Sequence, residues 1–242
     1  MTNQQISKSV GLESSLTSVE STSSDSSGCN FWQTVLVLCN VINHVLVLLT
    51  TGYLAYLSRD LSNVTNLHVL LCTIGYVLLM SEAIVTLTGE NVWSRKLTRR
   101  SNSHLHWILQ VLGAAFSIAG VYVMYAQRRQ HFRSVHALAG IASVGAIIGI
   151  FFTGLPALFA GRLRKVVRPV IGKFFHNFLG ILCFVVGMVS QIHGYKKGWL
   201  IRQTSSEVSM VMIVTTAMIT VFSLIGSLRS LWEQFKGHFK CR

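Results

Sequence analysis

The 242-residue chain is 51% hydrophobic, has a mean hydropathy of +0.52 and carries charge on only 12% of its residues. This composition is too apolar for a soluble domain of this length and indicates an integral membrane protein. The net charge of +13 could indicate a nucleic-acid partner, but the basic residues lie mainly between the apolar runs. That placement is typical of membrane topology signals, so no nucleic acid is expected.

Six apolar runs are long enough to cross a bilayer, which takes about 20 helical residues. The runs are continuous rather than alternating, which excludes a transmembrane β-barrel. The sequence therefore predicts an all-α integral membrane protein with one six-helix domain over residues 31–228. The predicted spans are 31–57, 67–88, 105–125, 135–157, 174–195 and 208–228.

The two chain ends are predicted to lie in the cytoplasm. Residues 1–30 are rich in Ser and Thr and predict a disordered tail without the pattern of a signal peptide, and residues 229–242 predict a basic tail. With six spans, both tails share one side of the membrane with the loops 89–104 and 158–173. That side carries 14 of the 21 lysines and arginines, so the positive-inside rule makes it cytoplasmic.

Four of the nine histidines lie in the first turn or so of the second to fifth spans. An ionisable side chain inside a span is costly and marks a candidate functional site. Because consecutive spans run in opposite directions, the histidines of spans two and four share one depth, and those of spans three and five share the other. The resulting pairs are His68 with His136 and His106 with His176.

Two facing imidazoles are what a six-coordinate haem iron requires, so the pairs predict two haems in a central four-helix bundle of spans two to five. A zinc or copper site is the alternative metal chemistry. It would gather its ligands at one point and include carboxylates or thiolates, whereas these histidines are split between two depths. The five cysteines show no paired spacing, so neither a zinc site nor a structural disulfide is expected.

Each of these histidines has a glycine on its own helical face, seven residues later in spans two and three and four residues later in spans four and five. A flat porphyrin lying against a helix needs a missing side chain beside its ligand. The alternative is that the glycines serve helix packing, as small residues commonly do in membranes. The four glycines are Gly75, Gly113, Gly140 and Gly180.

A non-redox six-span transporter or membrane scaffold, with structural histidines, is the alternative function. It predicts polar side chains near the bilayer midplane or helices broken by Gly and Pro. Pro156 lies near the end of a span, and Glu82 is the main polar exception near the midplane. His44 and His193, taken singly, are expected to form hydrogen bonds between helices.

Four stretches resemble the cytochrome b561 family, specifically its short "cytochrome b561 domain-containing" branch of transmembrane reductases. They are NLHVLL…LLMSEAIV, HLHWILQVLGA, VHALAGI and KFFHNFLGIL, within residues 66–190. The resemblance implies two b-type haems and usually a homodimer. It assigns His68 and His136 to the non-cytoplasmic haem, and His106 and His176 to the cytoplasmic one.

The resemblance also implies an ascorbate-dependent oxidoreductase, which passes electrons from cytosolic ascorbate to monodehydroascorbate or ferric iron on the far side. Arg100 matches a basic residue of the family, whereas His104 stands where better-known ascorbate-using members have a lysine. Arg100 and Lys173 are the expected donor contacts, because each lies within about two turns of a ligand histidine.

Two further expectations come from the branch. Glu82 matches an acidic residue common in it and is expected to be a buried hydrogen-bonding anchor near the cytoplasmic haem, rather than a proton-transfer group. The branch also favours the endoplasmic reticulum or another endomembrane, with the plasma membrane as the alternative.

Overall fold

The computed structural model describes residues 31–158 and 169–240, and over these residues it is helical and contains no strand. Six of its helices are long and apolar enough to cross a membrane, which confirms the predicted all-α membrane architecture. These spans are Phe31–Leu57, Val64–Val85, Arg99–Gln127, Val135–Gly154, Ile171–Tyr195 and Ser206–Lys236.

The chain divides into two compact units, Met1–Cys39 and Asn40–Arg242. The described part of the first unit is the helical stretch 31–39. The second unit contains the rest of the first span and all later helices, and therefore all nine histidines and the apolar core.

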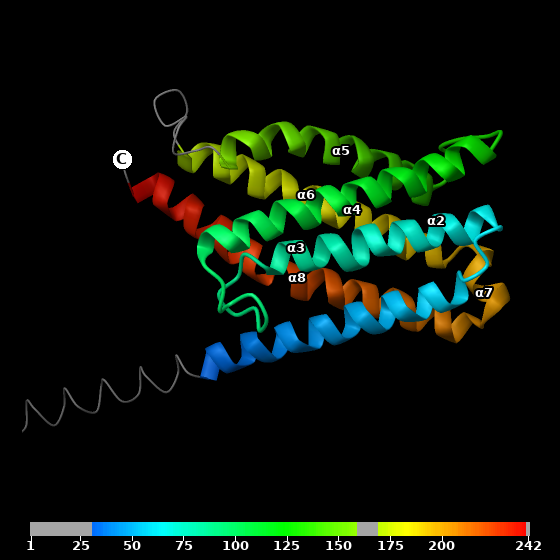
Figure 1. The fold of residues 1–242 in the computed structure, drawn as a ribbon, viewed down its shortest axis with the longest axis horizontal. Coiled ribbons are helices and arrows are strands. Elements are labelled where there is room, and N and C mark those ends of the chain that lie inside the picture. The colour runs from blue at the N-terminus through cyan, green and yellow to red at the C-terminus, as the bar shows by residue number, and fades with distance from the viewer. Residues whose placement is uncertain (1–30, 159–168, 241–242) are drawn as a thin grey trace, which may run out of the picture. The chain divides into compact units, whose positions relative to one another are not determined.

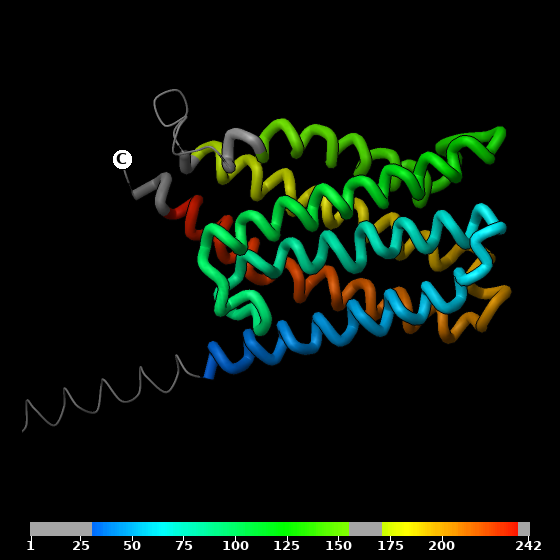
Figure 2. Tube along the Cα trace, in the orientation of Figure 1, coloured from blue at the N-terminus to red at the C-terminus, as the bar shows by residue number. Residues whose placement is uncertain are grey.

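The second span is one continuous rod made of three helical pieces (Figure 2). It consists of α2 (Val64–Cys72), the π-helix η1 (Thr73–Met80) and α3 (Ser81–Val85). The span begins before the predicted residue 67, because the Asn63 side chain accepts hydrogen bonds from the backbone N–H groups of Thr65 and Asn66 at 2.9 and 3.3 Å. The π-helical segment was not predicted.

The third span, α4 (Arg99–Gln127), also begins earlier than the predicted residue 105. Thr98 caps it, since its hydroxyl accepts a hydrogen bond from the Ser101 backbone N–H at 3.1 Å. This cap extends the helix beyond the apolar run by a polar, basic first turn.

The remaining helices are α5 (Val135–Leu158), α6 (Pro169–Tyr195), the short α7 (Gly198–Gln203) and α8 (Ser206–Lys240). Helix α7 lies in the connection between the fifth and sixth spans. Helix α8 continues through most of the stretch 229–242 that was predicted as a tail.

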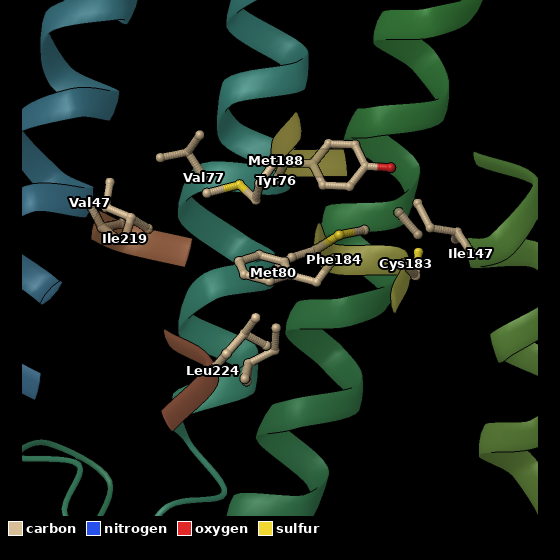
Figure 3. Close-up of a cluster of buried hydrophobic side chains, with 12 residues drawn as sticks. Val47, Tyr76, Val77, Met80, Ile147, Cys183, Phe184, Met188, Ile219 and Leu224 are labelled. Carbon is tan, nitrogen blue, oxygen red and sulfur yellow. The ribbon is translucent and has the colours of Figure 1, made fainter. Parts of the chain in front are cut away.

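Two helix pairs organise the second unit (Figure 1). Helix α4 lies along α2 and η1, and α5 lies along α6, while α8 packs against α6 and α3. Figure 3 shows the apolar core at mid-length of these helices, with Tyr76, Met80, Phe184 and Met188 in contact. Tyr76 and Phe184 each follow a candidate histidine by about two turns, so the core separates the two histidine pairs.

Candidate functional site

His68 on α2 and His136 on α5 form the first predicted pair, and the structure brings them together. Their ring centroids lie 5.8 Å apart with the ring planes at 85°. The Nδ1 of His68 donates to the Gly120 carbonyl at 2.8 Å, and that of His136 donates to the Ser190 carbonyl at 2.9 Å. A carbonyl oxygen only accepts hydrogen bonds, so each Nδ1 carries the proton and each Nε2 keeps a lone pair for a metal.

The spacing of this pair fits two ligands on one metal ion. An imidazole nitrogen binds a metal at about 2.0–2.1 Å, so two rings on opposite sides of an ion have centroids about 6 Å apart. Within residues 31–158 and 169–240, no three His, Cys, Asp or Glu side chains come together.

His106 on α4 and His176 on α6 are the second predicted pair. The Nδ1 of His106 donates to the Ala83 carbonyl at 2.7 Å. The Nδ1 of His176 lies 3.4 Å from the Thr153 hydroxyl, which itself donates to the Ile150 carbonyl. The hydroxyl therefore receives the Nδ1 proton, and Nε2 is again the ring nitrogen left with a lone pair.

The four Nδ1 bonds are reciprocal within each helix pair. The histidine of the second span is hydrogen-bonded to α4, and the histidine of α4 is hydrogen-bonded to α3. In the same way, the histidine of α5 is hydrogen-bonded to α6, and that of α6 to α5. Each predicted ligand pair instead combines one histidine from each helix pair. A second partner on the far ring nitrogen is the usual way in which proteins orient a metal-binding histidine.

A family model described as eukaryotic cytochrome b561 matches residues 67–201, which is more than half of the chain and includes all four histidines. The chain belongs to the cytochrome b561 family. The resemblance seen in the four sequence stretches is thereby confirmed.

Curated relatives carry the name transmembrane reductase CYB561D2. Those of Bos taurus and Mus musculus are 25% identical to this chain over 160 residues, and that of Homo sapiens is 24% identical over the same length. Each match covers 64% of this chain and 72% of the relative. No solved structure gives a significant match. Family and names together support an oxidoreductase that binds b-type haem and transfers electrons across a membrane.

Two of the glycines that were predicted to adjoin haem in this cytochrome b561 lie in a close helix crossing. A Cβ on Gly75 would come within 2.8 Å of the Gly113 carbonyl, and a Cβ on Gly113 within 3.0 Å of the Gly75 carbonyl. A side chain at either position would meet the opposite backbone. This environment supports the helix-packing alternative for Gly75 and Gly113.

The other two predicted glycines have different surroundings. A Cβ on Gly180 would meet nothing within 4 Å, and one on Gly140 would meet only the Ser190 hydroxyl, at 3.3 Å. Space beside the helix is thus present at these two positions. For Gly140 and Gly180, packing against a porphyrin stays a prediction.

Two glycines that sequence reasoning missed contact the histidine rings directly. A Cβ on Gly154 would lie 3.2 Å from Cε1 of His176, and a Cβ on Gly194 would lie 3.2 Å from Cε1 of His136. Each glycine lies on a different helix from the histidine that it contacts, Gly154 on α5 and Gly194 on α6. No spacing within a single helix marks such a contact, so no pattern in the sequence could have found it.

Glu82 and His44 form hydrogen bonds with each other rather than with the histidine pairs. The Nδ1 of His44 lies 2.6 Å from the Glu82 carboxylate, and both side chains are largely buried. The Trp93 indole N–H donates to the second carboxylate oxygen at 3.1 Å. Glu82 is therefore a buried hydrogen-bonding group, and His44 joins the first span to α3.

The predicted donor cations lie at the end of the bundle that carries His106 and His176, which we call the His106 end. Arg100 in the first turn of α4 and Lys173 in the first turns of α6 are both exposed. Arg95, Lys96 and Arg99 are exposed nearby. Three more cations that precede Lys173 in the sequence, Arg164, Lys165 and Arg168, fall outside the described residues.

At the opposite end, which we call the His68 end, a cavity of about 500 Å³ opens beside the start of α2. It is lined by Ser62, Asn63, Val64, Thr65, Met124, Gln127 and Arg128. Of the lining residues, Thr65 precedes His68 by about one helical turn.

Proposed function

We propose that this protein carries electrons across a membrane through two b haems, from cytosolic ascorbate to monodehydroascorbate or ferric iron on the opposite side. The observation that carries the proposal is the arrangement of the four histidines. His68 and His136 lie together with ring centroids 5.8 Å apart, and each of the four Nδ1 atoms is hydrogen-bonded to a neighbouring helix. The family and the reductase names of the relatives support the same chemistry.

In this proposal His68 and His136 hold one haem, and His106 and His176 hold the other. Bound haem supplies reversible one-electron reduction of its iron. The chain contributes the rest: the Nδ1 bonds orient the ligands and raise their basicity, while the apolar core around Tyr76 and Phe184 excludes water between the two sites.

The His106 end faces the cytoplasm in the proposed orientation, because most lysines and arginines of the sequence fall on that side. Arg100 and Lys173 then form part of a positive surface near the cytoplasmic haem. Such a surface attracts an anion such as ascorbate and speeds its arrival. The cavity beside Arg128 is the proposed acceptor site at the His68 end.

A homodimer in the endoplasmic reticulum or another endomembrane completes the proposal, and it rests on the family branch alone. Size-exclusion chromatography with light scattering on the detergent-solubilised protein measures the oligomeric state. Fluorescent fusions at either terminus, read by protease protection, measure both the compartment and the side on which the termini lie.

The decisive experiment is haem quantification of the purified protein by the pyridine haemochrome assay. We expect two haems per chain, and a loss of one haem in each of the variants His136→Ala and His176→Ala. The matched control His193→Ala, in the last turn of α6, should keep both. A folded but colourless wild-type protein would reject the redox function in favour of the transporter or scaffold alternative.

A further inference from the structure

A buried polar cluster outside the histidine pairs surrounds His44 and Glu82. Only 13% of the His44 side chain and 15% of the Glu82 side chain are exposed, and their contact is 2.6 Å long. The Nε2 of His44 lies 3.1 Å from the Asn40 side-chain oxygen and 3.2 Å from that of Asn91. Burying two ionisable groups in a membrane span is costly unless each is fully paired.

The hydrogen bonds determine where the protons are. Asn40 Oδ1 accepts from the Val92 backbone N–H at 3.0 Å, and Asn91 Oδ1 accepts from the Trp93 backbone N–H at 3.3 Å. Backbone N–H groups can only donate, so both amide atoms that face His44 are oxygens. The Nε2 of His44 must therefore donate, and it carries a proton.

The contact between His44 Nδ1 and Glu82 Oε1 then requires a second proton. Without it, two lone pairs would face each other at 2.6 Å. The pair is an imidazolium with a carboxylate, or an imidazole with a carboxylic acid, and its net charge is zero in both forms. The other Glu82 oxygen accepts from the Trp93 indole at 3.1 Å, which completes the carboxyl group's partners.

Glu82 directly precedes Ala83, the residue whose backbone carbonyl orients His106. The Ala83 carbonyl, next to Glu82, accepts the His106 Nδ1 proton at 2.7 Å and the Thr86 hydroxyl proton at 2.7 Å. Helix α3 ends at Val85, so Leu87 donates to Ile84 instead and the Ala83 carbonyl is open to these side chains. His44 and Trp93 hydrogen-bond to Glu82, the residue before Ala83, and thereby fix the position of α3.

We propose that His44 and Glu82 are positioning residues for His106, and that their shared proton keeps this buried region neutral and thereby sets the redox potential of the haem at the His106 end. The inference rests on the proposed function. A strong Nδ1 bond makes a histidine a more basic ligand and favours ferric iron. An unbalanced carboxylate nearby would favour ferric iron further, because it stabilises the more positive state.

The test is potentiometric titration of the haem at the His106 end, isolated in a His136→Ala background. We expect His44→Gln to lower its midpoint potential, because the shared proton leaves with the imidazole and a lone carboxylate remains. Glu82→Gln should leave the potential near the wild-type value, since the amide can accept from Trp93 and donate to a neutral His44. The double variant His44→Gln/Glu82→Gln should return toward the wild-type potential, because it restores neutrality.

Recovery in the double variant distinguishes charge balance from packing, since packing damage would grow with two changes. Ser223→Ala is the matched control: its hydroxyl accepts from Asn43, the residue before His44, at 3.1 Å, and its loss should not move the potential. His44→Asn, a smaller neutral replacement, covers the case in which His44→Gln does not fold, and should also lower the potential.

No downward shift in a folded His44→Gln or His44→Asn variant would overturn the proposal, as would a double variant no closer to wild type than His44→Gln. Failure of the proposed function would be detected in a different way, as an absence of haem from the wild-type protein. Haem content measured on every sample keeps the two failures apart.

Discussion

The ring of Tyr76 occupies the space where a side chain on Gly187 would stand. A Cβ on Gly187 would come within 2.6 Å of Tyr76 Cδ1 and 2.8 Å of its Cζ. The Tyr76 hydroxyl reaches past this glycine and donates to Ser143 at 2.6 Å. The second, fourth and fifth spans are thus joined through Tyr76, which lies in the apolar core (Figure 3).

Gly187→Ala should therefore destabilise the bundle. The added methyl group must displace an aromatic ring that is only 3% exposed, and overpacking of this kind costs about 1–3 kcal/mol. Thermal unfolding in detergent, followed by circular dichroism, measures the effect. Gly145→Ala, where a Cβ meets nothing within 4 Å, is the control, and equal melting temperatures for the two variants would contradict this packing.

Gly180→Leu should lower haem occupancy at the His106 end, because the new side chain would fill space left for the porphyrin. Nothing in the structure lies within 4 Å of a Cβ there, so the helix itself tolerates the change. Haem per chain and melting temperature, measured together, separate the two effects. Gly145→Leu, on a helix face without a registered histidine, should keep full haem content. Full loading in Gly180→Leu would leave this glycine without a haem role.

Gly194→Val should impair the other end. Its side chain would press on the His136 ring, because a Cβ at this position would lie 3.2 Å from the ring's Cε1, and would push Nε2 out of line. We expect roughly half the wild-type haem, with the His106 end unaffected, as judged by absorbance and by haem titration. Ser190 also contacts His136, since its hydroxyl donates to the His136 carbonyl at 2.9 Å, so Ser190→Ala should give a milder loss.

Arg100→Ala combined with Lys173→Ala should slow haem reduction by ascorbate and flatten its dependence on salt. Exposed charges are screened beyond about 8–10 Å at physiological ionic strength, so steering by these cations weakens as salt rises. Stopped-flow absorbance across a salt series measures both quantities. Arg59→Ala removes an exposed cation near the opposite end and should change neither. A rate unchanged at every salt concentration would place the donor elsewhere.

The sequence was enough for the spans and for the proximity of His68 to His136, because both depend on simple periodicity and chain direction. The pairing of His68 with His136 needed only the alternation of antiparallel helices, and the rings are 5.8 Å apart. The ends of the helices were harder to predict from the sequence. Thr98 and Asn63 extend their helices by side-chain caps, which hydropathy does not record.

What the sequence could not supply was the set of contacts between helices. Gly113 is registered to His106 on its own helix, yet its missing side chain makes room for Gly75 on the next one. His44 was expected to bond to another helix, but its partner Glu82 follows a π-helical segment that alters which face the glutamate presents. Which side chains of neighbouring helices contact each other depends on how the whole bundle packs, and spacing along one helix does not record it.

The π-helix η1 has a consequence for changes in chain length. An α-helix turns by about 100° per residue, whereas a π-helix fits an extra residue into each turn. Deleting one residue within Thr73–Met80 would let the span relax toward a regular α-helix while keeping its composition. The removed residue is the extra one, so the rotation through the segment stays close to its present value, and Glu82 and the Ala83 carbonyl would keep facing His44 and His106. This segment therefore tolerates the loss of one residue, whereas a deletion within the regular α-helix α4 would turn every residue beyond it by about 100°.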